Sequence, residues 1–152
     1  MISCINLLRK DPAIDQEAFR AFLEDDYAQL CMRIPHMHEY EQNYVTLKEQ
    51  GDASSEAIQA DAFTIERYET LYDYETARAS REYAEVLCRR VDAVTYNETY
   101  VCLENVSIPL HAPGACHKKM TLLGRTAPEV SFEDFTREWY VIHSGCMAKM
   151  PT

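Results

Sequence analysis

Three histidines of the sequence could exchange protons or ligate a metal. His36 and His38 stand two residues apart, so an extended chain would place both imidazoles on the same side of a strand. Such a pair chelates a metal when a third ligand converges on it, for which Glu66 and His143 are candidates. A structural zinc site has four ligands. The alternative is therefore one histidine in a pocket wall and the other near solvent.

His143 is the first choice for a catalytic group. It follows Trp139 by about one turn of a predicted helix. An imidazole can pass a proton to or from a bound carbonyl or phenol near neutral pH. The alternative is a histidine that packs beside Trp139 or faces solvent. We assign His143, His36 and His38 as candidate catalytic residues, and we expect no bound metal and no cofactor.

Aromatic and amide side chains could form the wall of a binding pocket. The sequence contains ten tyrosines, whose rings are apolar and whose hydroxyls bind phenolic or carbonyl groups. Tyr40 and Tyr68 are the favoured pocket residues, although amphipathic rings also suit half-buried sheets. Asn43 is a candidate for orienting a polar ligand group, or for a turn or sheet edge. Trp139 is a further candidate for ligand contact.

Glu66 is the candidate base among the carboxylates. Glu66 and Arg67 are neighbours in a predicted strand, so they point to opposite faces and at most one of them enters a pocket. An inward Glu66 in an apolar site would have a raised pKa and could accept a proton. The alternative is a solvated strand face.

Composition and charge exclude several classes of function. The 152 residues carry a formal net charge of −10, which disfavours binding to nucleic acid and to anionic membrane surfaces. The chain has four glycines, with no glycine-rich phosphate loop and no GxSxG motif. Six cysteines are widely spread without a CxxC pair, and the N-terminus does not resemble a signal peptide. We expect reduced thiols in a cytoplasmic protein.

The elements that must position these residues follow from the hydrophobic pattern. A strand is predicted at residues 2–8, a helix from Asp15 to Pro35, strands at 38–47 and 62–68, a helix at 71–91 broken near Ser80, and a strand at 95–110. This β-α-β-β-α-β order predicts an α+β, ferredoxin-like fold. In the second helix we expect Arg89 and Arg90 on the solvated face and, on the core face, Tyr83, Val86, Leu87 and Val91.

The C-terminal residues repeat the beginning of the chain. An ungapped offset of 116 pairs Arg9 with Arg125, Pro12 with Pro128 and Phe19 with Phe135. The copy ends at residue 152, where its second strand would begin. We therefore expect one ferredoxin-like domain at 1–112, followed by a linker and a β-α half-repeat at 113–152.

Several short motifs resemble the EthD family of dimeric α+β barrel proteins. Phe135, Trp139 and His143 match the helix that follows a strand and a proline turn. In the first copy, Ile34-Pro35, Tyr40 and Gln42-Asn43 resemble a second stretch of the family, and residues 63–83 resemble its third strand and following helix. The chain departs from the family at two positions: Tyr27 replaces the histidine of the first helix, and His36 replaces the glycine after Pro35.

The resemblance implies a sheet that packs on the sheet of a second copy, with a pocket between sheet and helices. Members of the family are associated with degradation of small organic compounds and with polyketide or pigment processing, often without a cofactor. We expect a homodimer that binds a small aromatic or hydrophobic molecule, with oxidation or cyclisation supported by a histidine. The alternatives are a non-catalytic ligand-binding or accessory protein, and a metal- or haem-dependent enzyme that uses His36 and His38.

Overall fold

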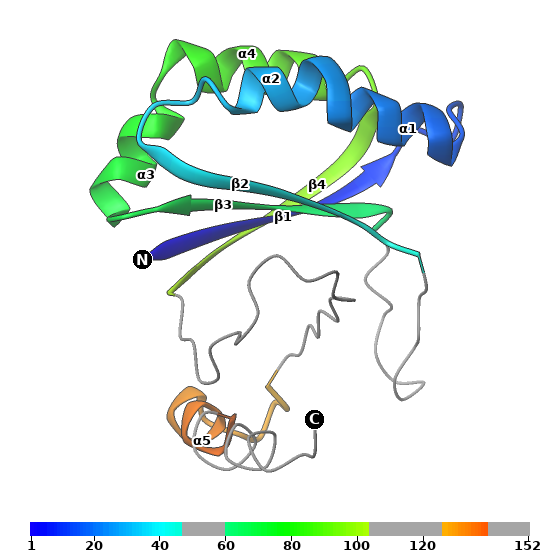
Figure 1. The fold of residues 1–152 in the computed structure, drawn as a ribbon. Helices are drawn as coiled ribbons and strands as arrows, with labels where there is room; N and C mark the ends of the chain where they lie inside the picture. The colour runs from blue at the N-terminus through cyan, green and yellow to red at the C-terminus, as the bar shows by residue number, and fades with distance from the viewer. Residues whose placement is uncertain (47–59, 104–125, 140–152) are drawn as a thin grey trace, which may run out of the picture. The chain divides into compact units, whose positions relative to one another are not determined.

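The computed structural model describes residues 1–46, 60–103 and 126–139 (Figure 1). The chain divides into two compact units, Met1–Glu104 and Asn105–Thr152, which are described separately. The predicted β-α-β-β-α-β order of the first unit is confirmed. Its elements are β1 (Ile2–Lys10), α1 (Gln16–Phe22), the π-helical segment η1 (Leu23–Tyr27), α2 (Ala28–Cys31), β2 (Met37–Tyr44), β3 (Ala62–Tyr68), α3 (Leu71–Arg78), α4 (Arg81–Arg90) and β4 (Val94–Leu103).

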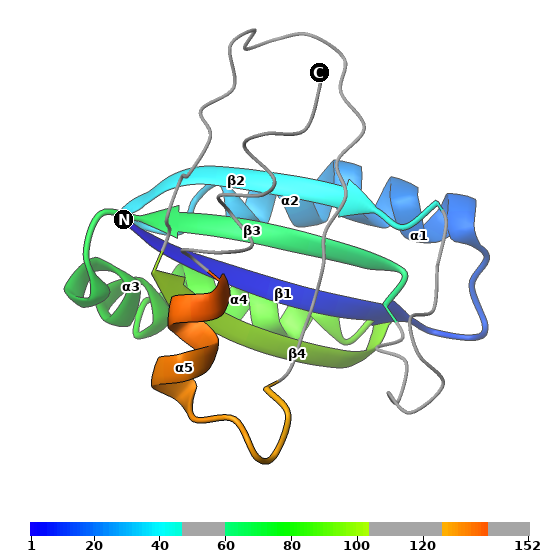
Figure 2. The same cartoon turned by 90° about the horizontal axis from the view of Figure 1, so that it is seen from below.

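The four strands form one antiparallel sheet in the order β2-β3-β1-β4. The helices of the first unit all lie against one of its faces, as the two views in Figure 1 and Figure 2 show. In the register of the sheet, Glu66 of β3 lies between Cys4 of β1 and Tyr40 of β2. These three residues form a row on one face, because directly paired residues share a side of the sheet.

Alternation along β3 decides which side chains meet the helices. Thr64 and Glu66 are buried on the helix-covered face, whereas Phe63 and Ile65 lie on the opposite face. Of the two alternatives for Glu66, the structure therefore has the inward one, and the solvated strand face does not apply to it. The apolar core around it comprises Ile2, Cys4, Leu8, Phe19, Leu23, Tyr27, Cys31, Ile34, Ala62, Tyr68, Tyr74, Ala77, Tyr83, Val86, Ala93 and Val94.

The first helical segment begins at Asp15 and is kinked in its middle. The Asp15 carboxylate accepts a hydrogen bond of 2.7 Å from the Ala18 amide, as a helix cap does. Within η1, Asp25 leaves the helical conformation (φ −90°, ψ −116°). Beside this kink, Gln42 of β2 donates a hydrogen bond of 2.6 Å to the Leu23 carbonyl. A side chain that binds a helix carbonyl in this way is a recognised companion of kinks, and here it fixes the helix to the sheet.

His36 has the backbone conformation that glycine adopts at no steric cost. The helical segment ends before Pro35, and His36 follows with φ 62°, in the left-handed region. This is the position where the resemblance expects glycine. The predicted extended chain from His36 to His38 is wrong, because β2 begins at Met37 and its pairing with β3 is interrupted between Met37 and Glu39.

The break between α3 and α4 lies where the sequence predicts it. The Ser80 hydroxyl accepts a hydrogen bond of 3.1 Å from the Tyr83 amide and begins α4. A serine at this position satisfies an amide that the first turn of a helix leaves free.

The buried face of α4 differs from the predicted one. Tyr83, Val86 and Arg90 point into the core at spacings of three and four residues. Leu87 and Val91 are exposed, Val91 by 74%, so their assignment to the core is wrong. The solvated position predicted for Arg90 is also wrong, because this arginine is only 5% exposed.

The second unit contains α5 (Phe132–Arg137). The Ser131 hydroxyl accepts a hydrogen bond of 3.0 Å from the Asp134 amide and so caps the start of this helix. One helical turn apart, Phe135 and Trp139 stack with ring centroids 5.9 Å apart. Among the described residues, no helix has the length and apolar composition that a membrane crossing requires.

The turns before α1 and α5 share their local geometry. The Ile14 amide donates to the Asp11 carbonyl over 3.2 Å, and the Val130 amide donates to the Ala127 carbonyl over 3.0 Å. These pairs stand at the offset of 116 that relates the two ends of the sequence. The repeat and the division into 1–112 and 113–152 stay predictions, and the part of the half-repeat that precedes residue 126, where its strand is expected, lies outside the described residues.

Candidate functional site

A buried carboxylate occupies the middle of the helix-covered face. Glu66 is 1% exposed, and both of its carboxylate oxygens have partners. Asn6 Nδ2 of β1 donates to Oε1 over 3.0 Å, and Tyr68 OH donates to Oε2 over 3.0 Å. Asn6 is itself held from both sides, since its Nδ2 also donates to Thr64 and its Oδ1 accepts from Thr99 of β4. The strands therefore fix the carboxylate before any ligand is present.

Burial controls the protonation of Glu66. Removal from water disfavours the charged form and raises the pKa of this carboxyl above its ordinary value. The hydrogen bond from Tyr68, the positive charge of Arg90 and the hydrogen bond from Asn6 act in the opposite direction and only partly offset burial. A carboxyl whose pKa is raised by burial is a candidate for general acid–base chemistry.

A buried arginine reaches the same interior from the end of α4. Arg90 Nε donates a hydrogen bond of 2.8 Å to the hydroxyl of Tyr27 in η1, and its guanidinium lies over the Tyr27 ring at 5.9 Å. Nη2 of Arg90 is buried without a hydrogen-bond partner. Within the described part of the chain, Arg90 and Glu66 do not form an ion pair, although their charges influence each other.

Tyrosines and thiols surround these two charged groups. Tyr40 lies next to the Cys31 thiol and accepts a hydrogen bond of 3.2 Å from Gln42 Nε2. Burial raises the pKa of Tyr40 and Tyr68, and it raises that of Cys31 to about 11. These groups therefore remain protonated at neutral pH, where they present neutral hydroxyl and thiol groups rather than nucleophilic anions.

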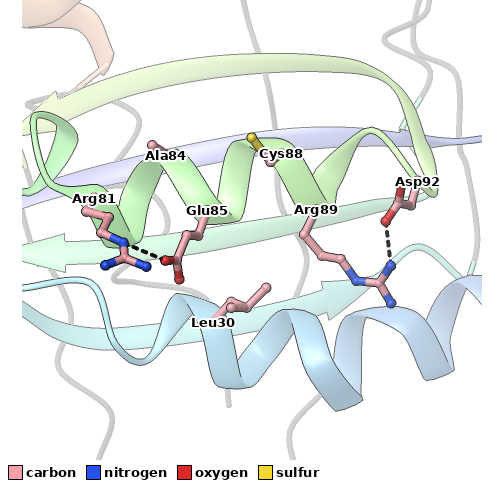
Figure 3. A pocket seen from close by; sticks show the side chains of 7 residues that line it. All are labelled: Leu30, Arg81, Ala84, Glu85, Cys88, Arg89 and Asp92. Atoms are coloured by element: carbon pink, nitrogen blue, oxygen red, sulfur yellow. Dashed lines mark hydrogen bonds and ion pairs between the residues drawn. The ribbon is translucent and has the colours of Figure 1, made fainter.

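A groove runs along the outer side of the same helices. Leu30 of α2 lines it together with Ala84 and Cys88 of α4, and Figure 3 shows the α4 side chains Glu85 and Arg89 extending towards α2. The cavity measures about 520 Å³, and a second one of about 540 Å³ shares Leu30 and Arg89 with it. Cys31 and Arg90 are the next residues in sequence after Leu30 and Arg89, and they point inward. The line along which η1–α2 packs against α4 is called the helical seam below. The groove lies on its outer side, and the buried Glu66 lies on its inner side.

Two ion pairs cross this seam at the surface. Arg33 Nη2 lies 3.1 Å from Glu85 Oε2, and Arg89 Nη2 lies 3.6 Å from Asp26 Oδ2. Exposed pairs of this kind contribute about 0–1 kcal/mol each. Beneath the surface, the buried hydrogen bond between Tyr27 and Arg90 joins η1 to α4.

The structure brings three of the predicted site residues together. Tyr40, Tyr68 and Glu66 all lie on the helix-covered face. Asn43 pairs with Phe63 and therefore points to the opposite face of the sheet. Asn43 Nδ2 is buried there without a hydrogen-bond partner.

The predicted histidines and Trp139 lie elsewhere. His36 and His38 are exposed, and each lies near a carboxylate: His36 Nδ1 is 3.5 Å from Asp73 Oδ1, and His38 Nε2 is 3.9 Å from Glu69 Oε2. No cluster of three or more potential metal ligands is found among the residues that the structure describes. His143 lies outside the described residues. Trp139 belongs to the second unit, whose placement relative to Glu66 is not defined.

Sequence reasoning missed Asn6, Tyr27 and Arg90 as members of this interior. Arg90 carried one usable signal, since it continues the 83–86–90 stripe of α4 at helical spacing. Tyr27 carried another, because it replaces the first-helix histidine of the EthD family. Asn6 stands between Ile5 and Leu7 in the apolar middle of β1, and a polar residue in such a place is buried with partners when it occurs.

No protein-family model and no curated protein matches the sequence. Solved structures match the fold. An EthD family protein from Bacillus halodurans has a TM-score of 0.56 and 15% identity over 69% of this chain and 99% of its own. A protein from Arabidopsis thaliana has a TM-score of 0.55 and 11% identity over 72% and 100%. A DABB family protein from Mesorhizobium loti has a TM-score of 0.52 and 16% identity over 69% and 97%.

The chain has an α+β, ferredoxin-like fold. The resemblance to the EthD family that the sequence motifs suggested is confirmed at the level of the fold, since an EthD family protein is among the similar structures. Identities of 11–16% establish the fold and leave the chemistry to the residues of this chain.

Proposed function

We propose that the first unit binds a small aromatic or otherwise hydrophobic organic molecule between its sheet and helices, with Glu66 as the group that exchanges a proton with it. The observation that carries this proposal is the buried Glu66 carboxyl, held by Tyr68 and Asn6 at 3.0 Å each in a largely apolar core. Retaining an ionisable group in such a place costs stability, and perturbed carboxyls are concentrated at functional sites.

The residues favour proton-transfer chemistry. Protonated, Glu66 would donate to a ligand carbonyl oxygen, and ionised, it would accept a proton from a phenol or from carbon next to a carbonyl. An intramolecular cyclisation by carbonyl addition balances with this group alone, since the proton removed from carbon is returned to the oxygen. An oxidation would need dioxygen as the electron acceptor. Proton transfer by His143 stays a prediction.

The helical seam is the proposed access route. It is open on its outer side, where Leu30 and Cys88 line the groove, and the surface ion pairs that cross it are weak. Separation of η1–α2 from α4 at the Tyr27–Arg90 contact would expose the face on which Glu66 lies. A π-helical segment such as η1 is frequent at functional sites, and it places Tyr27 at this contact.

We further propose that two copies of the chain associate through the other face of the sheet. Ile65 of β3, Ile5 of β1 and Tyr100 of β4 form a row across that face. A sheet with helices on one side needs a partner for an apolar second face. Size-exclusion chromatography with light scattering of Ile65→Lys tests this: a dimer that becomes a monomer supports the proposal, and an unchanged mass contradicts it.

A ligand panel tests the function. Phenols, quinones and aromatic ketones are screened by saturation-transfer NMR against the full chain, and binders are then assayed for turnover. Glu66→Gln keeps the shape of the side chain and removes proton exchange, while Glu69→Gln on the surface is the matched control. Binding with turnover that Glu66→Gln abolishes and Glu69→Gln retains supports the proposal. Turnover that persists in Glu66→Gln overturns the role of Glu66.

Two other outcomes of the panel are decisive. Binding without turnover in the unmodified protein favours the alternative, a non-catalytic ligand-binding protein. If no compound of the panel binds, the proposed function is rejected.

A further inference from the structure

Arg90 is buried with unused hydrogen-bonding capacity. It is 5% exposed, and a guanidinium remains charged at physiological pH. Its Nε is bound to Tyr27, but Nη2 has no hydrogen-bond partner. Buried polar groups nearly always have partners, so an exception in a charged group requires an explanation. Leaving such a donor unsatisfied costs stability.

Its neighbour in sequence shows the ordinary arrangement. Arg89 forms ion pairs with Asp26 and with Asp92 at the surface of the seam. Among the residues that the structure describes, the buried carboxylate near Arg90 is that of Glu66, and its oxygens are already bound by Tyr68 and Asn6. Within the described residues, the interior therefore holds a positive charge without a direct negative partner.

We propose that Arg90 is the anion-recognition group of this site, and that Nη2 binds an acidic oxygen on the ligand's aromatic ring, as a carboxylate or a phenolate. The inference rests on the proposed function and adds the class of ligand to it. Arginine suits such an oxygen, because its donors form charge-assisted hydrogen bonds in a fixed, planar geometry. The tyrosines and apolar side chains around it suit the ring that carries the oxygen. Glu66 then faces the ligand beside its bound oxygen.

A matched pair of probes tests this assignment. 2-Naphthoate carries the acidic oxygen, and 2-naphthamide has the same ring without the charge. Titrations followed by NMR are carried out on the full chain, on Arg90→Met, which keeps much of the side-chain length without the charge, and on Arg90→Lys. Arg20→Met, at an exposed arginine of α1, removes the same charge outside the site.

The expected result is a preference of about tenfold or more for naphthoate in the unmodified protein. Arg20→Met should keep this preference and Arg90→Met should remove it, with little change in binding of the amide. Should Arg90→Met fail to fold, the Nε–Hε resonance of Arg90 in the unmodified protein, assigned by its absence in Arg90→Lys, should shift on addition of naphthoate and not of naphthamide.

Failure of this inference differs from failure of the proposed function. If both probes bind equally, or if Arg90→Met keeps the preference, the role of Arg90 is overturned while ligand binding stands. If neither probe binds, the site itself is rejected, and the role of Arg90 with it.

Discussion

Tyr27 and Arg90, 63 residues apart in the chain, join the kinked first helical segment to the end of α4 through a buried hydrogen bond of 2.8 Å. Neither residue belongs to the sheet, yet together they close the helical layer above Glu66. The tyrosine hydroxyl thus accepts one hydrogen bond of a buried charged group, and the same hydrogen bond holds η1 against α4.

Tyr27→Phe should destabilise the protein. The substitution leaves Arg90 Nε without an acceptor, and an unsatisfied buried donor on a charged group costs about 1–3 kcal/mol. Urea denaturation measures the free energy of unfolding, with Tyr72→Phe at an exposed position as the control. Equal unfolding free energies for Tyr27→Phe and the unmodified protein would show that the bond contributes nothing.

Glu66 should make stability fall as pH rises. Its pKa is raised in the folded state, mainly by burial, so the folded protein binds more protons than the unfolded chain. The stabilisation is complete below the ordinary pKa of 4.5 and is lost as pH increases through the folded-state pKa. The groups that act on this carboxyl are Tyr68, Arg90, Asn6 and Arg78, and their effects are smaller than that of burial.

The measurement compares urea unfolding of the unmodified protein, Glu66→Gln and Glu69→Gln from about pH 4.5 to about pH 8. Stability of the unmodified protein should decline relative to Glu66→Gln as pH rises, and Glu69→Gln should follow the unmodified protein. Parallel curves for the unmodified protein and Glu66→Gln would contradict a raised pKa at this position.

Substitution of His36 should change the stability of the protein through the backbone conformation at this position rather than through the imidazole. Its φ of 62° is disfavoured for residues with a Cβ by about 1–2 kcal/mol. We expect His36→Gly to be at least as stable as the unmodified protein and His36→Val to be destabilised by about 1–2 kcal/mol. Turnover, where the panel finds any, should be unchanged in His36→Gly. Loss of turnover in a stable His36→Gly would restore this histidine as a catalytic candidate.

The sequence predicts elements well where local signals agree, as at β3 and at the break before Ser80. It fails where the pattern leaves open which of the two faces of a strand the helices cover. Phe63 and Ile65 are more apolar than Thr64 and Glu66, yet the helices cover the polar pair, whose hydrogen bonds come in part from Asn6 of β1, a partner that no pattern within β3 reveals. The kink at Asp25 and the left-handed His36 are likewise set by tertiary contacts and by chain direction rather than by propensity.

The charged members of the site were hidden for the same reason. An arginine at the end of a helix is ordinarily solvated, so Arg90 is assigned to the surface unless Tyr27 is known to lie opposite it. Tyr40, Tyr68 and the inward alternative for Glu66 could be proposed from strand alternation alone, since each depends only on neighbours in its own strand.

Modification of Cys88 should block the groove. Its thiol is exposed, and Cys88 lines the same groove as Leu30 (Figure 3). A bulky maleimide attached there should slow the binding of 2-naphthoate by occupying the access route. Stopped-flow measurement before and after labelling gives the association rate, with labelled Cys88→Ser as the control for reaction at other thiols. An unchanged rate would place the access route elsewhere.

Binding of an anion at Arg90 should be accompanied by proton uptake at Glu66. The positive charge of Arg90 lowers the pKa of the Glu66 carboxyl, against the larger effect of burial. An anion paired with Arg90 neutralises that charge and adds a negative one nearby, so the pKa of Glu66 rises further on binding. By linkage, the complex then takes up protons at pH values between the pKa of the free protein and that of the complex.

Calorimetric titration with 2-naphthoate in two buffers of different ionisation enthalpy measures this uptake. Across the pH range in which Glu66 titrates, the apparent heat of binding should depend on the buffer in the unmodified protein and should not do so in Glu66→Gln. Arg20→Met should behave like the unmodified protein, because the charge it removes lies outside the site. Buffer-independent heats in the unmodified protein throughout this range would mean that the two charges are not coupled through the ligand, whereas buffer-dependent heats that persist in Glu66→Gln would assign the proton to another group.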